Sequence, residues 1–205
     1  MRAMNLAVLS VSVLGALLAE EPQPTAYVVE GGKLATCTVR SVTDLEDIVT
    51  TTNAVAGTIA CDRAKGTGSV FLTVKAASLD TGIPMRNEHL RGEKWLDTAK
   101  FPEITFKSTG LKHLKGDEYE IVGDFTMRGM TKPVIAKAVV RFLDDEKAVK
   151  TLGGPAVKAV ASFSVKLSDF GITPPGIGIK VSDSLDISLS VFGVDKPIAK
   201  EEPKK

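Results

Sequence analysis

The sequence predicts an all-β fold, an antiparallel barrel or sandwich of roughly eight strands with a short helical cap. Three observations support this prediction. Apolar and polar residues alternate with a period of two through much of the chain, turn-forming residues separate the alternating runs, and one segment breaks the alternation. Because successive strand side chains point to opposite faces of a sheet, each run has one row toward a core and one toward solvent.

The expected strands follow one another with short connections. Turn-forming residues stand at Lys65–Gly68, Lys115–Glu118 and Gly129–Pro133. The segment Arg86–Ala99 predicts one or two helical turns that cap the sheet, and Phe101–Pro102 ends them because the residue before proline avoids the helical region. The strands are expected at Lys33–Ser41, Thr52–Cys61, Val70–Ala76, Glu103–Leu111, Tyr119–Met127, Val134–Val140, Phe163–Leu167 and Leu185–Val191.

Composition excludes several classes of protein. The chain has 205 residues, of which 26 are basic and 25 acidic, so the formal net charge is +1. Proteins whose main task is to bind nucleic acid usually carry a basic excess. Two cysteines and two histidines are too few for a four-cysteine zinc module or a histidine-based catalytic centre. We therefore expect no metal, no cofactor and no nucleic-acid partner.

Both ends of the chain differ from the middle. Residues 1–19 predict a secretory signal peptide, with a basic start at Met1–Arg2 and an uncharged apolar run over Leu6–Ala19. This run is shorter than the roughly 18–20 residues that span a bilayer, so an uncleaved anchor is the weaker alternative and no transmembrane segment is expected after signal removal. Residues 196–205 predict a disordered charged tail. One domain, residues 20–195, remains, in a protein expected to be periplasmic or secreted.

The inward rows decide whether such a barrel is hollow or filled. Bulky inward side chains such as Phe125, Met127 and Phe163 favour a filled interior, whereas small ones favour a space for one ligand. The sequence alone leaves both open. The small inward residues are Ala35, Ala76, Gly123, Ala136, Ala138 and Ala161.

Four blocks of sequence stand in an order and spacing typical of one family. The blocks are Ala77–Gly82 with Arg86–Leu90, Phe101–Thr109, Gly123–Val134, and Phe163–Ile172, which the closing strand Val181–Ile187 follows. Together they resemble the YceI family of bacterial polyisoprenoid-binding proteins, over roughly Tyr27 to Val194.

This resemblance implies an eight-stranded antiparallel lipocalin-like barrel with an elongated apolar pocket. The implied ligand is a long isoprenoid chain, such as a polyprenyl pyrophosphate or an isoprenoid quinone, and the implied location is the periplasm. No catalytic activity is implied. The segment Tyr27–Ser41 departs from the family because it has no histidine and carries Cys37 at an expected aromatic position, so the ligand could differ from that of the relatives.

The candidate ligand-binding residues lie on the inward rows and near the cap. Arg86 and His89 would place a cation and a hydrogen-bonding ring at the pocket mouth for a head group. The alternative, which we favour, is that this block ties the cap onto the barrel. The apolar lining is expected from Val39, Ile59, Leu72, Val74, Phe106, Ile121, Phe125, Phe163 and Ile187.

Cys37 and Cys61 are expected to form a disulfide. Both stand on inward rows of strands predicted to be neighbours, and an exported protein meets an oxidising compartment. Two buried free thiols are the alternative.

The expected function is therefore non-enzymatic binding, transport or storage of a polyisoprenoid or similar lipid. A ligand-free structural or protein-interaction barrel of the cell envelope is the alternative, and a homodimer is allowed. An enzyme is disfavoured because no serine lies in a Gly-x-Ser-x-Gly context, and Lys65–Gly68 lacks the spacing of a phosphate-binding loop.

Overall fold

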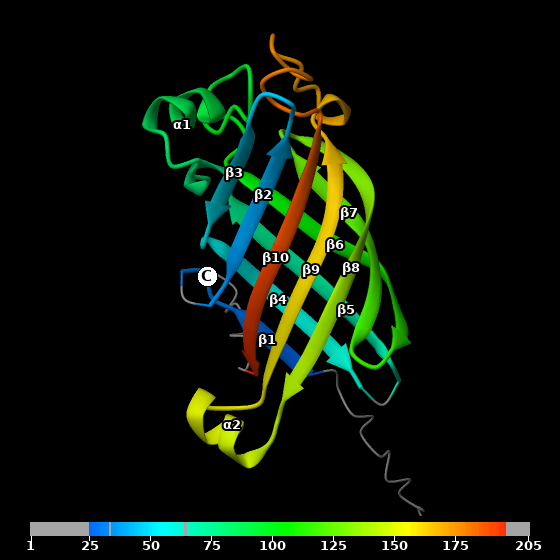
Figure 1. Cartoon of the computed structure of the whole chain (residues 1–205). Helices are drawn as coiled ribbons and strands as arrows, with labels where there is room; N and C mark the ends of the chain where they lie inside the picture. The colour runs from blue at the N-terminus through cyan, green and yellow to red at the C-terminus, as the bar shows by residue number, and fades with distance from the viewer. Residues whose placement is uncertain (1–24, 33, 64, 196–205) are drawn as a thin grey trace, which may run out of the picture.

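The computed structural model describes residues 25–32, 34–63 and 65–195. The signal peptide expected at residues 1–19 and the tail expected at 196–205 lie outside the described residues. In chain order the elements (Figure 1) are β1 (Thr25–Val29), β2 (Thr36–Val42), β3 (Asp47–Thr52), β4 (Val55–Asp62), β5 (Thr67–Lys75), η1 (Ala76–Ser78), α1 (Pro84–Arg91), β6 (Glu103–Lys115), β7 (Glu118–Met127), β8 (Met130–Leu143), α2 (Glu146–Leu152), β9 (Ala156–Lys166), η2 (Ser168–Phe170) and β10 (Ser184–Asp195).

The strands form one antiparallel sheet that closes on itself. Within the described residues the sheet has ten strands, and eight of them close a ring in the order β1-β4-β5-β6-β7-β8-β9-β10, with β1 paired to both β4 and β10. The closing register places Tyr27 opposite Asp195 of β10 and Ile59 of β4. The eight-stranded antiparallel barrel predicted from the sequence is confirmed.

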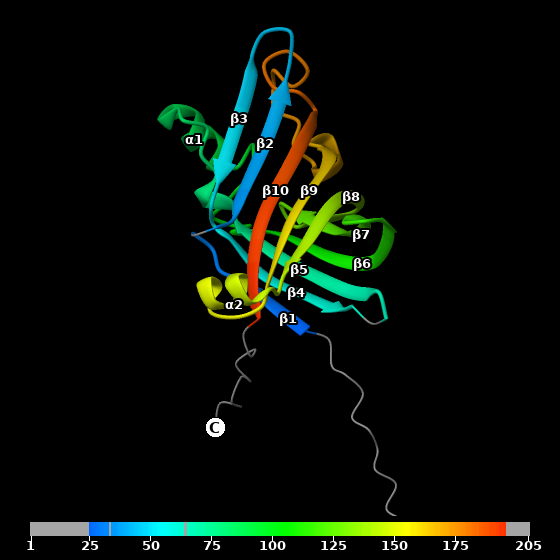
Figure 2. The same cartoon turned by 60° about the horizontal axis from the view of Figure 1, so that its bottom comes forward.

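The remaining two strands form a hairpin that extends the barrel wall. β10 pairs with β2 over Asp186–Ser190 and then with β1 over Gly193–Asp195, so the β2–β3 hairpin stands beyond β1 on the side of α1. Figure 2 shows β1 at the end of the barrel opposite α1. The outer edge of β3 meets the chain before α1 through two backbone hydrogen bonds between Thr51 and Asp80, of 2.8 and 2.9 Å.

The expected strand list is corrected at the amino-terminal side. β1 and β3 were not expected, and the strands at Lys33–Ser41 and Thr52–Cys61 were expected to be neighbours. In the structure β2 pairs with β10 and β3, whereas β4 pairs with β1 and β5. The inward row of β3 is Ile48, Thr50 and Thr52, so two of three buried positions are polar and the apolar alternation is weak.

Two short helices lie at opposite ends. α1 begins with Pro84 at its first turn, where proline suits the helix, and it ends at Arg91, so the predicted cap is confirmed as one helix followed by turns. α2 was not expected. Asp145 accepts a hydrogen bond from the Ala148 N–H at 3.0 Å, and Gly153 ends the helix with φ of 79°. None of the helices in the described ranges is long and apolar enough to cross a bilayer.

Gly57 lies in β4 at the level where β1 ends, in tight contact with β5. It pairs with Val29 of β1 and Leu72 of β5, and its φ is +149°. A Cβ atom added at Gly57 would stand 2.0 Å from the carbonyl oxygen of Phe71, which belongs to the neighbouring backbone. Glycine is therefore required at this position by both conformation and space.

We expect Gly57→Ala to lower the free energy of unfolding by about 3 kcal/mol, because the added methyl must push β4 from β5. Gly116→Ala is the control, since Gly116 also has positive φ, +52°, but open space around its Cβ position. Conformational strain alone should cost the control about 1 kcal/mol. Urea unfolding of both variants measures the difference, and equal losses would contradict the close approach.

Candidate functional site: an apolar cavity inside the barrel

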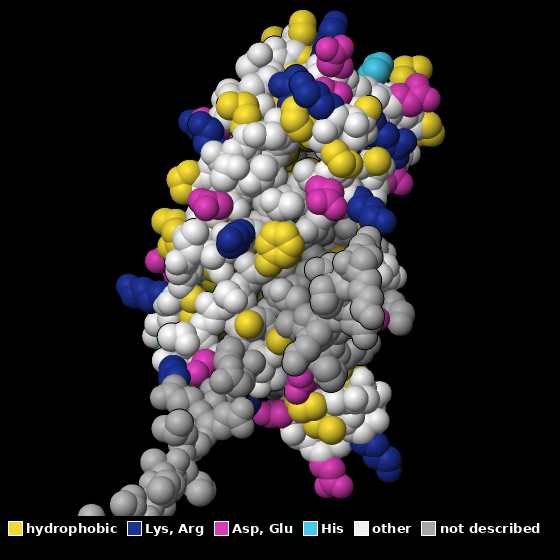
Figure 3. Space-filling model, turned by 180° about the vertical axis from the view of Figure 1, so that it is seen from behind, with side chains coloured by type: hydrophobic (Ala, Val, Ile, Leu, Met, Phe, Trp, Pro, Cys, Tyr) yellow, Lys and Arg dark blue, Asp and Glu magenta, His cyan; other side chains and the backbone are white. Residues whose placement is uncertain are grey.

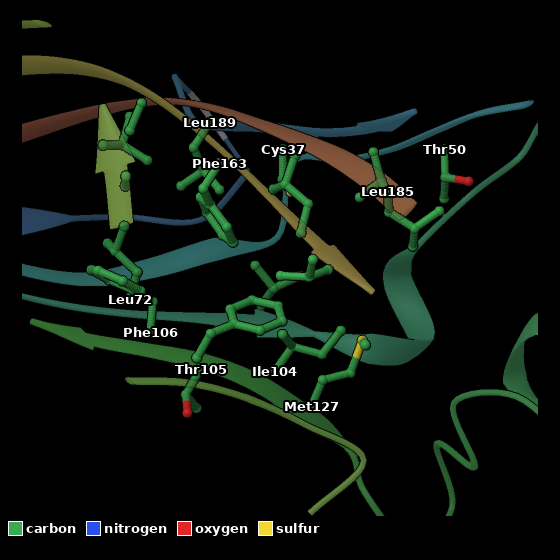
Figure 4. A pocket seen from close by; sticks show the side chains of 18 of the residues that line it. Cys37, Thr50, Leu72, Ile104, Thr105, Phe106, Met127, Phe163, Leu185 and Leu189 are labelled. Carbon is green, nitrogen blue, oxygen red and sulfur yellow. The ribbon is translucent and has the colours of Figure 1, made fainter. Parts of the chain in front are cut away.

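The barrel is hollow. A cavity of about 810 Å³ extends along its interior, from the α1 end to the turns β4–β5 and β6–β7. Phe163 and Leu72 in Figure 4 project from opposite walls into this space, with Cys37 and Phe106 on the same respective sides. Phe125, Met127 and Phe163 line the cavity and do not fill it. The question that the sequence left open, hollow or filled, is thus answered in favour of hollow.

The structure places every predicted ligand-binding residue on the cavity wall. The nine apolar positions come from seven strands and face one space, and Arg86 and His89 lie at its α1 end. The residues are Val39, Ile59, Leu72, Val74, Arg86, His89, Phe106, Ile121, Phe125, Phe163 and Ile187.

Small side chains keep part of the lumen open. Ala138 on β8 stands in register between Tyr119 of β7 and Ala161 of β9, and all three line the cavity. Gly123 has a different role, because a Cβ there would lie 2.5 Å from Cζ of Phe106. The missing side chain lets the Phe106 ring lie across β7.

Four phenylalanine rings form an aromatic cluster, in which Phe106, Phe125 and Phe163 line the lumen and Phe170 lies behind them in the core. Phe125 contacts Phe163 edge-on at a centroid distance of 5.4 Å, and Phe170 of η2 at 5.7 Å. Phe106 and Phe163 are 6.2 Å apart although β6 and β9 are not neighbours in the sheet. Rings at these separations attract each other beyond their burial, so they hold opposite walls at a defined spacing.

At the α1 end, the cationic side chain is already paired. Nη2 of Arg86 donates to Oε2 of Glu46 at 2.9 Å and so ties α1 to the β2–β3 hairpin. Asn87 accepts hydrogen bonds from the N–H and hydroxyl of Thr81, and its own amide donates to Asp80. These contacts support the interpretation that the block secures the cap. The hydrogen bond from Asn87 is the main cause that lowers the pKa of Asp80.

The opposite end has a second paired cation. The Arg63 guanidinium is hydrogen-bonded to the Asp144 carboxylate and lies 4.5 Å from the ring centroid of Phe142. Arg63 and Phe142 both line the cavity. Nearby, the rings of His113 and Tyr119 are 4.9 Å apart. Each end of the cavity therefore carries a paired arginine, and the middle of the cavity is apolar.

Sequence reasoning missed one residue that organises the α1 end. Arg128, in the tight β7–β8 turn, donates to the carbonyl of Gly171 at 2.7 Å and to that of Glu93 at 3.0 Å. It thus joins the loop after η2 to the turns after α1. The only sign of Arg128 in the sequence is the Arg128–Gly129 pair, which is typical of a tight turn. In the structure Arg128 has a φ of +50°, as such a turn requires.

The expected disulfide is corrected by the structure. Both Cys37 and Cys61 are free thiols that line the cavity, and their strands, β2 and β4, are not neighbours in the sheet. Burial raises the pKa of the Cys37 thiol to about 11 and also raises that of Cys61. In the described ranges, no three histidine, cysteine or carboxylate side chains are placed to hold a metal ion.

The fold and the site together define the class of protein, an antiparallel β-barrel that encloses an apolar cavity. Residues 28–192 match the family model of the YceI-like domain, and the chain belongs to this family. A UPF0312 protein of Pseudomonas savastanoi pv. phaseolicola is 34% identical over 141 residues, 68% of this chain and 70% of the relative. Protein YceI of Escherichia coli O157:H7 is 38% identical over 127 residues, 62% of this chain and 63% of the relative.

Solved structures show the same fold at lower identity. BcnA of Burkholderia cenocepacia superposes with a TM-score of 0.66 at 22% identity, over 77% of this chain and 95% of that one. A polyisoprenoid-binding domain from Saccharophagus degradans gives a TM-score of 0.60 at 13% identity, over 84% of this chain and 99% of that one.

The reactivity of Cys37 and Cys61 tests whether these thiols are unpaired and whether Cys37 is buried in the cavity wall. We expect the intact mass of the purified protein to be unchanged by reductant. Because the pKa of Cys37 is raised, its alkylation by iodoacetamide in the folded protein should keep accelerating as pH rises toward about 11. Thiols of the unfolded chain should level off near their ordinary pKa, about 8.5. Cys37→Ala identifies the Cys37 signal, and a plateau near the ordinary pKa in the folded protein would contradict the burial.

Proposed function

We propose that the protein binds and carries, or stores, a polyisoprenoid or similar lipid without acting on it chemically. The observation that supports this most is the apolar cavity of about 810 Å³, in the range typical of ligand sites. Removing an isoprenoid chain from water contributes about 0.8 kcal/mol for each buried methylene. The name of the Saccharophagus degradans domain, polyisoprenoid-binding, agrees with this ligand class. The expected signal peptide supports a role in the periplasm or outside the cell.

The charges at the two ends favour a neutral head group. Arg86 is paired with Glu46, and Arg63 with Asp144. At either arginine, a diphosphate would have to displace a carboxylate or accept its repulsion, which leaves Lys180 as the cavity-lining cation for such a head group, whereas a quinone carbonyl needs only one hydrogen-bond donor. Of the two ligands that the family resemblance implies, we therefore favour an isoprenoid quinone over a polyprenyl pyrophosphate.

Lipid extraction tests the proposal directly. Protein purified from its native host should release a long-chain isoprenoid into organic solvent, near one molecule per chain by mass spectrometry. A substitution that fills the cavity with a larger side chain should abolish the release of this lipid. A clean extract from the native protein, together with no uptake of added isoprenoid quinone or polyprenyl pyrophosphate, would favour the alternative of a ligand-free barrel.

Trp95 gives a binding signal, because it is the only tryptophan of the chain and its side chain lines the cavity. An isoprenoid quinone should quench its fluorescence on binding. Ala138→Phe places a ring in the lumen and should weaken that binding about tenfold or more. Val139→Phe is the matched control, since Val139 is the next residue on β8 and faces outward. Equal affinities of the two variants would place the ligand outside the cavity.

A further inference from the structure

The most exposed hydrophobic side chains gather around one end of the cavity. Among the described residues, the three highest exposures of large hydrophobic side chains belong to Leu45 at 64%, Met85 at 68% and Ile179 at 68%. They come from three separate segments, the tip of the β2–β3 hairpin, the start of α1 and the loop between η2 and β10. Val42 and Ile83 add two half-exposed neighbours. We call these five side chains the apolar rim.

Contacts in the structure place the three segments side by side. The Arg86–Glu46 ion pair joins the residues next to Met85 and Leu45. The N–H of Ser182 donates to the hydroxyl of Ser41 at 2.9 Å, which joins the η2–β10 loop to β2. Figure 1 shows the hairpin tip, α1 and this loop at the same end of the barrel.

The rim is continuous with the cavity. Ile83 and Met85 line the cavity and are also exposed, and Lys180, next to Ile179, lines it as well. An apolar path therefore leads from the lumen to the outer surface along Ile83 and Met85. Leaving large apolar groups in water is unfavourable, and clustered exposed apolar groups mark interaction sites.

We propose that the apolar rim docks the barrel on a lipid bilayer, with the mouth of the cavity facing the acyl chains. The choice of a bilayer rests on the proposed lipid cargo, because a cargo that is itself a membrane lipid must enter and leave through a surface that excludes water. Three side chains on separate short segments suit shallow insertion between head groups. The docked mouth would let an isoprenoid chain pass into the lumen without crossing water.

Charge has little part in this docking. The three segments and their flanks carry cations and carboxylates in nearly equal number, namely Arg40, Arg86, Arg91 and Lys180 against Asp44, Glu46, Asp47, Glu88 and Asp183. Arg40–Asp47 and Arg86–Glu46 are ion pairs. Hydrophobic side chains at the upper end of Figure 3 are interspersed with both signs of charge. Binding should therefore not depend on anionic lipid, and salt should change it little.

The test is co-sedimentation of the full chain with phosphatidylcholine vesicles, with and without phosphatidylglycerol and over a range of salt. Wild-type protein should bind both vesicles alike. The combined variant Leu45→Glu, Met85→Glu and Ile179→Glu should lose about tenfold or more of the partition coefficient, because charged side chains replace the inserting ones. The control variant carries Leu34→Glu, Phe71→Glu and Ile135→Glu, at exposed hydrophobic positions away from the rim, and should bind as wild type.

A second measurement does not depend on how well these variants fold. The two native cysteines are removed by Cys37→Ala and Cys61→Ala. A single new cysteine, Met85→Cys in one protein and Ile135→Cys in another, is then labelled with an environment-sensitive fluorophore. The emission of the label at position 85 should shift to the blue with vesicles, and that at position 135 should not.

Absence of vesicle binding by wild type, equal shifts at both positions, or binding only to anionic vesicles at low salt would overturn the proposal. Lipid extraction from the same preparation separates it from the carrier function. Lipid in the barrel without vesicle binding would leave the carrier standing and overturn the docking.

Discussion

The hollow interior depends on closure of the sheet through β1. This strand pairs on one edge with β4 and on the other with β10, and these two pairings close the ring. A closed sheet satisfies its backbone hydrogen bonds without a packed centre, so side chains inside are free to line a space. An open sheet of the same sequence would have to collapse its apolar rows on each other. The cavity, and with it the proposed lipid site, therefore depends on the few backbone pairings of Tyr27 and Val29 with β4 and β10.

Inside the ring, large and small side chains have different tasks. The aromatic cluster of Phe106, Phe125, Phe163 and Phe170 keeps the walls at a fixed distance. The alanines on β8 and β9 have small side chains and so leave the cavity empty beside them. The two arginines of the cavity wall lie at its ends, where the carboxylates of Glu46 and Asp144 pair with them. This division explains how a chain with nearly balanced charge keeps an apolar lumen while its surface remains polar.

Most of the wall could be predicted from sequence, because period-two alternation survives in long strands such as β7 and β8. The prediction failed where that signal is weak. β3 turns threonines inward, and β1 is five residues long. Missing both strands made β2 and β4 seem to be neighbours, and the expected Cys37–Cys61 bridge was a direct consequence of that wrong order. The apolar rim and the bridges of Arg128 join segments distant in the chain, which no local pattern reports.

The number of backbone hydrogen bonds that hold neighbouring segments together differs around the barrel wall. Where β3 meets Asp80, two backbone hydrogen bonds take the place of a full ladder. The Arg86–Glu46 ion pair and the hydrogen bond between the hydroxyls of Thr52 and Ser78 reinforce this edge. The eight-stranded ring does not depend on these contacts, because β3 is not a member of it. The wall beside α1 therefore rests on fewer backbone hydrogen bonds than the closed ring beside β1. Local opening of the protein should therefore begin at this seam and leave the ring folded.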